Sequence, residues 1–413
     1  MSTNFLNLPG VRIQEVRLGA PPIAGVGTST AGFVGKSPFS TAFKNVARQV
    51  TSADQFLKDY VRDPADPDNE KVGGKTNTNL SAAVLGFFQN GGTECYVLDV
   101  GSEASADIVT GLAKFEKIEE IDIIAAPGIA DKDVYAALKG QAEGMRNRFA
   151  LYDPPLDVVD LANLSKPPTP PTSPPTPPPA EDGLRPPDSI WAALYYPWVQ
   201  ISPFLFDDKE AVKANPNKTF FAPPSGHVAG LYARVDATRG VHKAPANDVL
   251  LGTVGVRRAV TDAEQNTLND NSVNIIRAFP AGPTVFGART LQLSATPLDL
   301  SFRYVSVRRL TTFIEQSLRI GLRFAVFEPN NLALRQIITR SVRGFLDGVW
   351  RDGALFGATA DEAYYVRFPD PFNTDTERAL GRLTLEVGIR PAPPAEFIII
   401  RIGVLDRPAN ATT

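Results

Sequence analysis

The feature that most constrains this 413-residue chain is a regular alternation of short apolar runs with helical patterns. Near-continuous apolar strands joined by helices are typical of a parallel sheet that is covered on both faces. We therefore expect an α/β domain in this part of the chain. The expected strands lie at 95–100, 121–126 and 148–153, the helices between them lie at 106–117 and 131–144, and the sheet pattern resumes at 190–201.

Two polar residues in this region are expected to cap helices. Asn79 precedes a helical pattern over 80–90, and Ser225 begins one over 225–240. Short polar side chains at these positions accept a hydrogen bond from the first helical turn.

The chain after about residue 286 predicts a second, smaller unit of mixed composition, α/β or α+β. Its apolar runs and helical patterns alternate less regularly than those of the first domain. The expected strands are 303–307, 323–327, 363–368, 382–389 and 396–404, and the expected helices are 308–321 and 331–350.

We expect four parts along the chain. They are an extended arm over 1–20, an outer domain over 21–285, an inner domain over 286–395 and a C-terminal strand arm over 396–413. The outer domain contains a proline-rich insertion, 163–187, in which nine of the thirteen residues from Pro167 to Pro179 are proline. Such a run adopts polyproline II or stays mobile, and it is interpreted as a surface spacer. A ligand for a PxxP-reading domain is the alternative.

The charge of the chain is unevenly distributed. The total of 42 basic and 45 acidic residues gives a net charge of -3, but residues 251–413 carry 19 arginines, no lysine and 16 acidic residues, which is +3. Arginine makes bidentate, partly dehydrated contacts, so this half suits protein interfaces, although codon bias is an alternative cause. An acidic total without a long basic run argues against nucleic-acid binding.

The residues of common catalytic and metal sites are scarce. One cysteine, Cys95, and two histidines exclude a disulfide framework and the usual zinc spacings. The segment 30–37, TAGFVGKS, approaches a phosphate-binding loop, but Thr30 replaces the first glycine and Pro38 follows it. We therefore expect no catalytic, cofactor or metal site. We also expect no secretion signal, because the first residues, MSTNFLNLPGVRIQEV, contain no basic region followed by an apolar stretch. We expect no membrane span, because no apolar run reaches about 18 residues.

Ten segments, in order along the chain, resemble tail sheath proteins of contractile phages and of related contractile injection systems. They include NGGTECYVLDV (90–100), NIIRAFPAGPTVFGARTL (274–291) and RYVSVRRLTTFIEQS (303–317), and the most specific is PPSGHVAGLYARVDATRGVHKAPAN (223–247). The resemblance implies a structural subunit, not an enzyme, that polymerises as stacked hexameric rings around an inner tube. Contraction of the sheath then drives the tube through a target cell envelope.

The resemblance also implies the fold class and the partners. The fold class is α/β, with an outer subtilisin-like three-layer α/β/α domain that lacks the protease residues, a smaller α+β inner domain and extended terminal arms. Implied partners are further copies of the chain, the inner tube protein, and baseplate and terminal cap proteins, and whether sheath paralogues join the lattice stays open. No nucleic acid and no membrane insertion are expected. The protein is expected to be made in the bacterial cytoplasm and to join a phage tail or a phage tail-like particle.

The resemblance implies that terminal arms add strands to neighbouring subunits, and both arms of this chain are strand-like. An unbroken apolar strand at a free edge invites pairing with another chain, which a polymer requires. A central strand of the chain's own sheet is the alternative for either segment. The residues of the predicted exchange are Val11, Ile13 and Val16 in the first arm, and Phe397, Ile398, Ile399, Ile400 and Ile402 in the second.

The helix expected from about residue 331 is the predicted contact with the inner tube. Leu334, Ile337, Ile338, Ser341, Val342, Phe345 and Val349 fall within one arc of about 140°. The opposite arc contains the predicted contact residues Arg335, Thr339, Arg340 and Arg343, which suit an acidic tube surface. A merely solvated helix face is the alternative.

Two other functions stay open. One is a non-contractile baseplate or terminator protein. The other is a subtilisin-like or other α/β hydrolase that would use Ser225 and one of the histidines His227 and His242.

Overall fold

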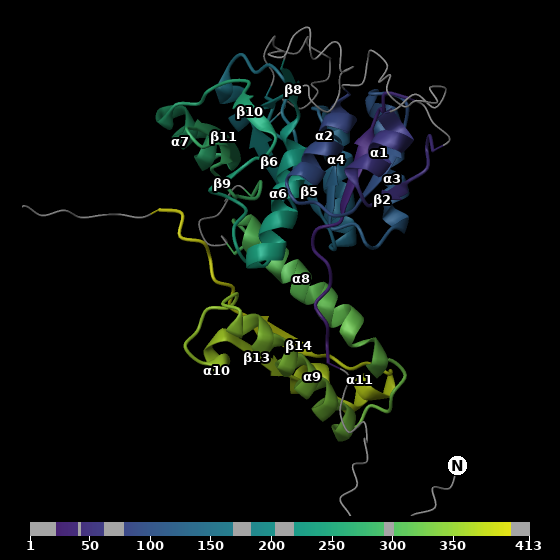
Figure 1. Ribbon diagram of the computed structural model, residues 1–413. Coiled ribbons are helices and arrows are strands. Elements are labelled where there is room, and N and C mark those ends of the chain that lie inside the picture. The colour runs from purple at the N-terminus through teal and green to yellow at the C-terminus, as the bar shows by residue number, and fades with distance from the viewer. Residues whose placement is uncertain are drawn as a thin grey trace, which may run out of the picture. The chain divides into compact units, whose positions relative to one another are not determined.

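The structure is a computed structural model that describes residues 22–39, 43–61, 78–167, 183–202, 219–292 and 301–397 (Figure 1). The chain divides into two compact units, and the division falls inside helix α8 (Val305–Gly321), after Gln316. Of the described residues, the larger unit takes those of 25–316 and 391–397, and the smaller unit takes 317–390 and 22–24. This differs from the boundary expected near 286, because Val305 of α8 lies in the core of the larger unit.

The larger unit is built on a nine-stranded sheet in which six neighbouring strands are parallel. In spatial order its strands are β2 (Arg48–Val50), β3 (Cys95–Asp99), β1 (Ala31–Gly35), β4 (Ile123–Ala125), β5 (Phe149–Tyr152), β6 (Ala192–Tyr196), β11 (Val273–Phe279), β12 (Gly282–Val285) and β9 (Asp248–Val249). At one edge, β2 pairs antiparallel with β3. At the other edge, β12 pairs antiparallel with β11, and β9 pairs antiparallel with β12. The mixed α/β fold that the apolar runs predicted is confirmed.

Each face of this sheet has its own hydrophobic core, because successive side chains of a strand point to opposite faces. Phe33 and Val97 belong to one core, and Val34 and Leu98 belong to the other. Helices cover both faces (Figure 1). The first core receives side chains from α1 (Ala53–Phe56), α2 (Asn79–Gln89) and α6 (Pro224–Arg239), and the second from α3 (Ser105–Lys114), α4 (Lys132–Met145) and α7 (Asp262–Asp270).

Both expected N-caps are wrong by one or two residues. Thr78, not Asn79, caps α2: its side chain accepts a hydrogen bond from the Ser81 N–H at 3.2 Å, and the Ser81 hydroxyl accepts one from the Thr78 N–H. Pro223 is the N-cap of α6, so Ser225 lies inside the first turn. A proline at the start of a helix loses no hydrogen bond, because the first N–H groups have no helical acceptor.

A second sheet in the larger unit has three antiparallel strands. Its order is β10 (Thr253–Val256), β7 (Val199–Ile201) and β8 (Phe220–Ala222). The described residues of this unit also form short helical segments at Leu57–Val61, Phe115–Lys117 and Leu161–Ser165.

The two ends of the proline-rich insertion lie side by side. The Leu184 N–H donates to the Asn163 carbonyl at 2.8 Å, and the Arg185 N–H donates to the Lys166 carbonyl at 3.0 Å. Leu164 and Arg185 are buried. Residues 163–167 and 183–187 therefore belong to the folded unit, and the insertion expected over 163–187 is narrower at both ends. Residues 168–182 lie outside the described part of the chain.

The smaller unit combines helices with a two-stranded antiparallel sheet. After α8 come a 3₁₀ turn (Arg323–Ala325), α9 (Leu332–Arg351), α10 (Ala360–Ala363), β13 (Tyr364–Arg367), a 3₁₀ turn (Asp370–Phe372), α11 (Asp375–Ala379) and β14 (Glu386–Ile389). The helix expected over 331–350 is confirmed as α9, and β13 and β14 lie within the strands expected at 363–368 and 382–389.

Two expected strands, 303–307 and 323–327, are wrong. Residues 305–307 form the first turn of α8, and 323–325 form a 3₁₀ turn. The β-branched run at Val305 and Val307 favours a strand locally. Burial of Leu310 and Ile314, four residues apart on one helix face, overrides that preference.

Candidate functional site

Helix α9, from which the sequence predicts a partner contact, has one packed face. The Asn331 side chain caps the helix by accepting a hydrogen bond from the Leu334 N–H at 2.9 Å. Its buried residues are Leu334, Ile338, Ser341, Val342, Leu346 and Val349. Ile337 and Phe345 are half-buried, and Leu346 was absent from the expected arc. The apolar arc is therefore the side by which α9 packs into its own unit.

The four predicted contact residues differ in their surroundings. Arg335 is half-buried, and its guanidinium lies 3.5 Å from the Asn330 side-chain oxygen and 5.7 Å from the centre of the Phe368 ring. The Thr339 hydroxyl donates to the Arg335 carbonyl at 2.9 Å. Arg340 and Arg343 are exposed, and within the described ranges their guanidinium groups make no hydrogen bond or ion pair. These two are the residues available to a partner.

The exposed face of α9 also contains residues that the sequence reasoning missed. Arg351 is exposed, and at 1.5 Å rise per residue it lies about 17 Å along the helix from Arg340. Gly344 and Gly348 occur between them, and a Cβ atom at either glycine would meet no other described part of the chain within 4 Å. The spacing of four residues between these glycines was the available signal in the sequence.

Asp347, the acidic residue of α9, accepts a hydrogen bond from within its own unit. The Tyr364 hydroxyl, from β13, donates to Asp347 Oδ1 at 2.6 Å. Burial, followed by this hydrogen bond, raises the pKa of Tyr364 to about 12. The three exposed arginines, Arg340, Arg343 and Arg351, outnumber this one carboxylate, so the exposed face of α9 presents a net positive charge.

The residues of the predicted strand exchange lie almost entirely outside the described part of the chain. This applies to Val11, Ile13 and Val16 in the first arm, and to Ile398, Ile399, Ile400 and Ile402 in the second. Phe397 is described, and its side chain is 72% exposed. Strand exchange therefore stays a prediction.

Ser225, the nucleophile of the hydrolase alternative, is bonded to a carboxylate. Its hydroxyl donates to Asp153 Oδ2 at 2.6 Å and its N–H donates to Oδ1 at 2.8 Å, while the Gly128 N–H also donates to Oδ2 at 2.9 Å. Burial raises the pKa of Asp153 to about 6 against the lowering effect of these bonds. The arrangement fixes the start of α6 to the end of β5.

His227 has a packing role between two helices. It is buried, and neither ring nitrogen has a hydrogen-bond partner within the described ranges. Its ring occupies the space beside Gly86 of α2, where an added Cβ atom would lie 2.4 Å from the ring. Burial lowers the pKa of His227 to about 4, so the ring is neutral at pH 7. The Ser225 hydroxyl therefore donates to Asp153, and His227 makes no hydrogen bond to it among the described residues.

The segment that approaches a phosphate-binding loop is a strand and a turn. Residues 31–35 form β1, and the Ser37 N–H and hydroxyl donate to Asp99 at 3.0 and 2.7 Å. In the described ranges no group of three or more His, Cys, Asp or Glu side chains is placed to hold a metal ion. No helix there has the length and apolarity needed to cross a membrane.

Two family models match consecutive parts of the chain. The phage tail sheath protein central domain matches residues 101–291, and the phage tail sheath C-terminal domain matches residues 299–404. Together they cover more than half of the chain. The chain belongs to the phage tail sheath protein family.

Curated relatives of this sheath protein match it over part of their length. The tail sheath protein of Burkholderia phage BcepMu is 30% identical over 182 residues, which are 42% of this chain and 36% of that protein. A prophage major tail sheath protein of Pseudomonas aeruginosa is 27% identical over 194 residues, 45% of this chain and 47% of that protein. The chain thus matches less than half the length of either relative.

Solved structures match the sheath protein along nearly its whole length. A chain in the anti-feeding prophage baseplate is 28% identical, with a TM-score of 0.72 and coverage of 97% of this chain and 99% of that one. A chain in the contracted PVC sheath complex, an extracellular contractile injection system, is 26% identical, with a TM-score of 0.72 and coverage of 97% and 98%. The contracted helical sheath of the anti-feeding prophage gives 28% identity, a TM-score of 0.70 and coverage of 97% and 99%.

Proposed function

We propose that this protein is the structural subunit of a contractile sheath. It polymerises as stacked hexameric rings around an inner tube and contracts to drive the tube through a target cell envelope. The observation that carries the proposal is the likeness over 97% of the chain, at 26–28% identity, to chains of two contracted sheath assemblies. The larger unit is then the outer, subtilisin-like three-layer domain, and the smaller unit is the inner domain that attaches to the tube.

The terminal arms link neighbouring copies by strand exchange. The first arm, 1–20, and the second arm, 396–413, add strands to adjacent subunits through their apolar residues. Each backbone hydrogen bond of an added strand contributes about 0.5–1.5 kcal/mol net. Exposure of Phe397, where the second arm leaves the body, supports this role. Links of this kind keep subunits connected while the contacts between their folded bodies change.

Helix α9 makes the contact with the inner tube. This proposal is supported by the exposed arginines Arg340, Arg343 and Arg351. The two glycines between Arg340 and Arg351 have no side chain, so a partner can approach the helix backbone closely there. Exposed ion pairs contribute about 0–1 kcal/mol each, so a single subunit holds an acidic tube surface weakly. Repetition along a tube gives a firm attachment that still permits release.

The remaining assignments follow from this role. The protein has no enzymatic activity, cofactor or metal, is made in the bacterial cytoplasm and is incorporated in a phage tail or phage tail-like particle. Besides its own copies and the tube, its partners are baseplate proteins and terminal cap proteins. It binds no nucleic acid and inserts into no membrane.

A second candidate is a single ring at the baseplate. The match to a chain of the anti-feeding prophage baseplate favours it, because that structure places a chain of the same fold within a baseplate. A ring component would form isolated rings and no long tubes.

Negative-stain electron microscopy of the purified protein tests the proposal. We expect striated tubes from the full chain, and folded monomers without tubes when residues 1–20 are deleted. Isolated rings would favour the baseplate role. Monomers of the full chain at high concentration, or normal tubes without residues 1–20, would contradict polymerisation through the arms.

A further inference from the structure

The segment that leads into the second arm has few means of attachment. Residues 391–397 read PAPPAEF, and three of the seven are prolines, which have no N–H group to donate. Among the described residues, the backbone of 392–397 makes no hydrogen bond. The segment also forms one wall of a pocket of about 520 Å³, whose opposite side includes Phe286 and Tyr304. Neither backbone bonding nor close packing therefore fixes this part of the chain.

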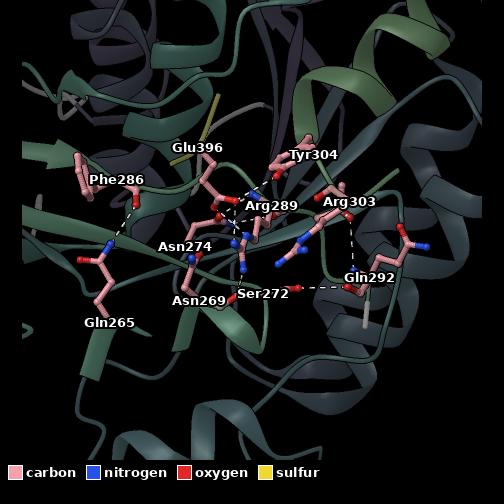
Figure 2. Close-up of polar contacts among 11 residues, drawn as sticks. Gln265, Asn269, Ser272, Asn274, Phe286, Arg289, Gln292, Arg303, Tyr304 and Glu396 are labelled. Carbon is pink, nitrogen blue, oxygen red and sulfur yellow. Dashed lines mark hydrogen bonds and ion pairs between the residues drawn. The ribbon is translucent and has the colours of Figure 1, made fainter. Parts of the chain in front are cut away.

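One side chain attaches the segment to the body of the larger unit. Figure 2 shows Glu396 reaching Arg289 and Tyr304. Arg289 donates from Nε to Oε1 at 2.8 Å and from Nη2 to Oε2 at 2.7 Å, and the Tyr304 hydroxyl donates to Oε2 at 3.1 Å. A bidentate arginine pair fixes both position and orientation. Hydrogen bonds from Arg289 and Tyr304 lower the pKa of Glu396 although burial opposes them.

Arg289 is itself fixed to the central sheet. It is 1% exposed, and its Nη1 donates to the Asn269 carbonyl at 2.6 Å. Its N–H donates to the Asn274 side-chain oxygen at 2.7 Å, and the Asn274 amide donates to the carbonyls of Arg289 at 2.8 Å and of Leu194 at 3.1 Å. Figure 2 shows Asn274 beside Arg289. Asn274 lies on β11 and Leu194 on β6, so Arg289 and its hydrogen bonds connect Glu396 to two parallel strands.

We propose that Glu396 is the anchor of the second arm: its ion pair with Arg289 fixes the point at which the arm leaves the body and transmits force from a neighbouring copy into the central sheet. This inference rests on the proposed function, in which the arm links subunits. The proline segment before Glu396 is stiff, so an ion pair at Glu396 also limits the positions open to the described residues before it. An ion pair suits this position because it has one bonding geometry, whereas an apolar contact would permit several registers.

The anchor is tested on the monomer by the mobility of a nitroxide label at Ala395→Cys, an exposed position next to Glu396. Cys95 is buried and stays unlabelled under native conditions. We expect Glu396→Gln to shorten the rotational correlation time of the label by about fivefold or more, towards that of an unattached side chain. Asp157→Asn, which breaks an exposed ion pair with Arg257 in the same unit, is the matched control and leaves the label unchanged.

Glu396→Gln leaves the Arg289 charge buried without a full partner, which can destabilise the fold. The double variant Arg289→Gln/Glu396→Gln is therefore measured in parallel, because two neutral amides remove that buried charge. An unchanged label mobility in either folded variant would overturn the anchor.

Assembly is scored on the same proteins by electron microscopy. We expect the number of tubes formed by Glu396→Gln to fall about tenfold, because each subunit contact loses one charge-assisted anchor. Wild-type protein that forms no tubes would refute the proposed function, while the mobility measurement on the monomer still decides whether Glu396 holds the segment. Wild-type tubes together with equally abundant Glu396→Gln tubes would overturn the anchor alone.

Discussion

Reversing the charge of the two exposed arginines on α9 perturbs the proposed tube contact without touching the packed face of the helix. The variant is Arg340→Glu/Arg343→Glu. Neither guanidinium bonds to another described residue, so the free energy of unfolding of the monomer should change by less than about 0.5 kcal/mol. Arg335 is left in place, because it is half-buried beside Phe368 and its replacement would disturb the fold.

The size of the effect follows from the exposure of these side chains. An exposed ion pair contributes about 0.5 kcal/mol, and reversal replaces that attraction with a repulsion of similar size. Two arginines therefore change the binding free energy by about 2 kcal/mol per subunit, which is roughly thirtyfold in affinity. Because many subunits attach along one tube, the effect on co-assembly is larger than this factor.

The assay is co-sedimentation of the sheath protein with its inner tube at low and at high salt. We expect the wild type to co-sediment at low salt and to weaken as salt screens the exposed charges. The charge-reversed variant should fail at both. Arg378→Glu/Arg382→Glu, the same charge change at exposed positions of the smaller unit outside α9, is the control. It removes two surface ion pairs, with Asp375 and Glu377, which contribute only about 0–1 kcal/mol each, so its co-sedimentation should match that of the wild type. Unchanged co-assembly of the α9 variant, or wild-type binding that is insensitive to salt, would refute the contact.

Further predictions concern stability and the packing of the helices. Gly344→Ala/Gly348→Ala should stabilise the monomer by about 1–2 kcal/mol in chemical denaturation, because alanine is the better helix former and both added Cβ atoms meet open space. The same variant should weaken co-sedimentation with the tube, because the added methyl groups keep a partner from approaching the helix closely. Arg309→Met should lower the free energy of unfolding by about 3–5 kcal/mol, because it removes the guanidinium that lies 2.5 Å from the buried Asp236 carboxylate. A loss below about 1 kcal/mol would contradict this reasoning. Burial lowers the pKa of His227 to about 4 from its ordinary 6.5, so the unfolded chain binds the proton at a higher pH than the folded one. The free energy of unfolding should therefore fall by about 3 kcal/mol as the pH drops from 6.5 to 4. His227→Gln should show a flatter dependence of this free energy on pH.

The larger unit could be predicted well from its sequence because local pattern and tertiary environment agree there. Phe149 to Tyr152 are all apolar, and all four are buried between two layers of helices, as a continuous apolar run indicates. The N-cap of α2 was missed by one residue, because Asn79 is a good cap by type, whereas the reciprocal bonds of Thr78 and Ser81 decide the position.

Long-range contacts explain the errors in the rest of the fold. The start of α8 contains Val305 and Val307, which favour a strand, but the next turn places Arg309 on Asp236 and Thr28, far away in the sequence. A buried ion pair of this kind has no local signature. The division of the chain inside α8 could not be predicted for the same reason.

The candidate contact helix was predicted from the sequence, but the burial and contacts of its individual side chains were not. The period of 3.6 separates the two faces of α9, so Arg340 and Arg343 were expected at the surface. Periodicity does not show that Phe368 covers Arg335, nor that the helix extends to Arg351. Glu396 carried no recognisable signal, because its role depends on the buried Arg289, more than a hundred positions away in the chain.

Cryo-electron microscopy of the protein assembled with its inner tube tests the central claim most directly. We predict a helical lattice of stacked rings in which Arg340 and Arg343 of α9 face the tube, and in which segments 11–16 and 397–402 pair as strands with neighbouring copies. A single ring, or a lattice in which α9 faces away from the tube and both terminal segments fold back on their own subunit, would contradict the account.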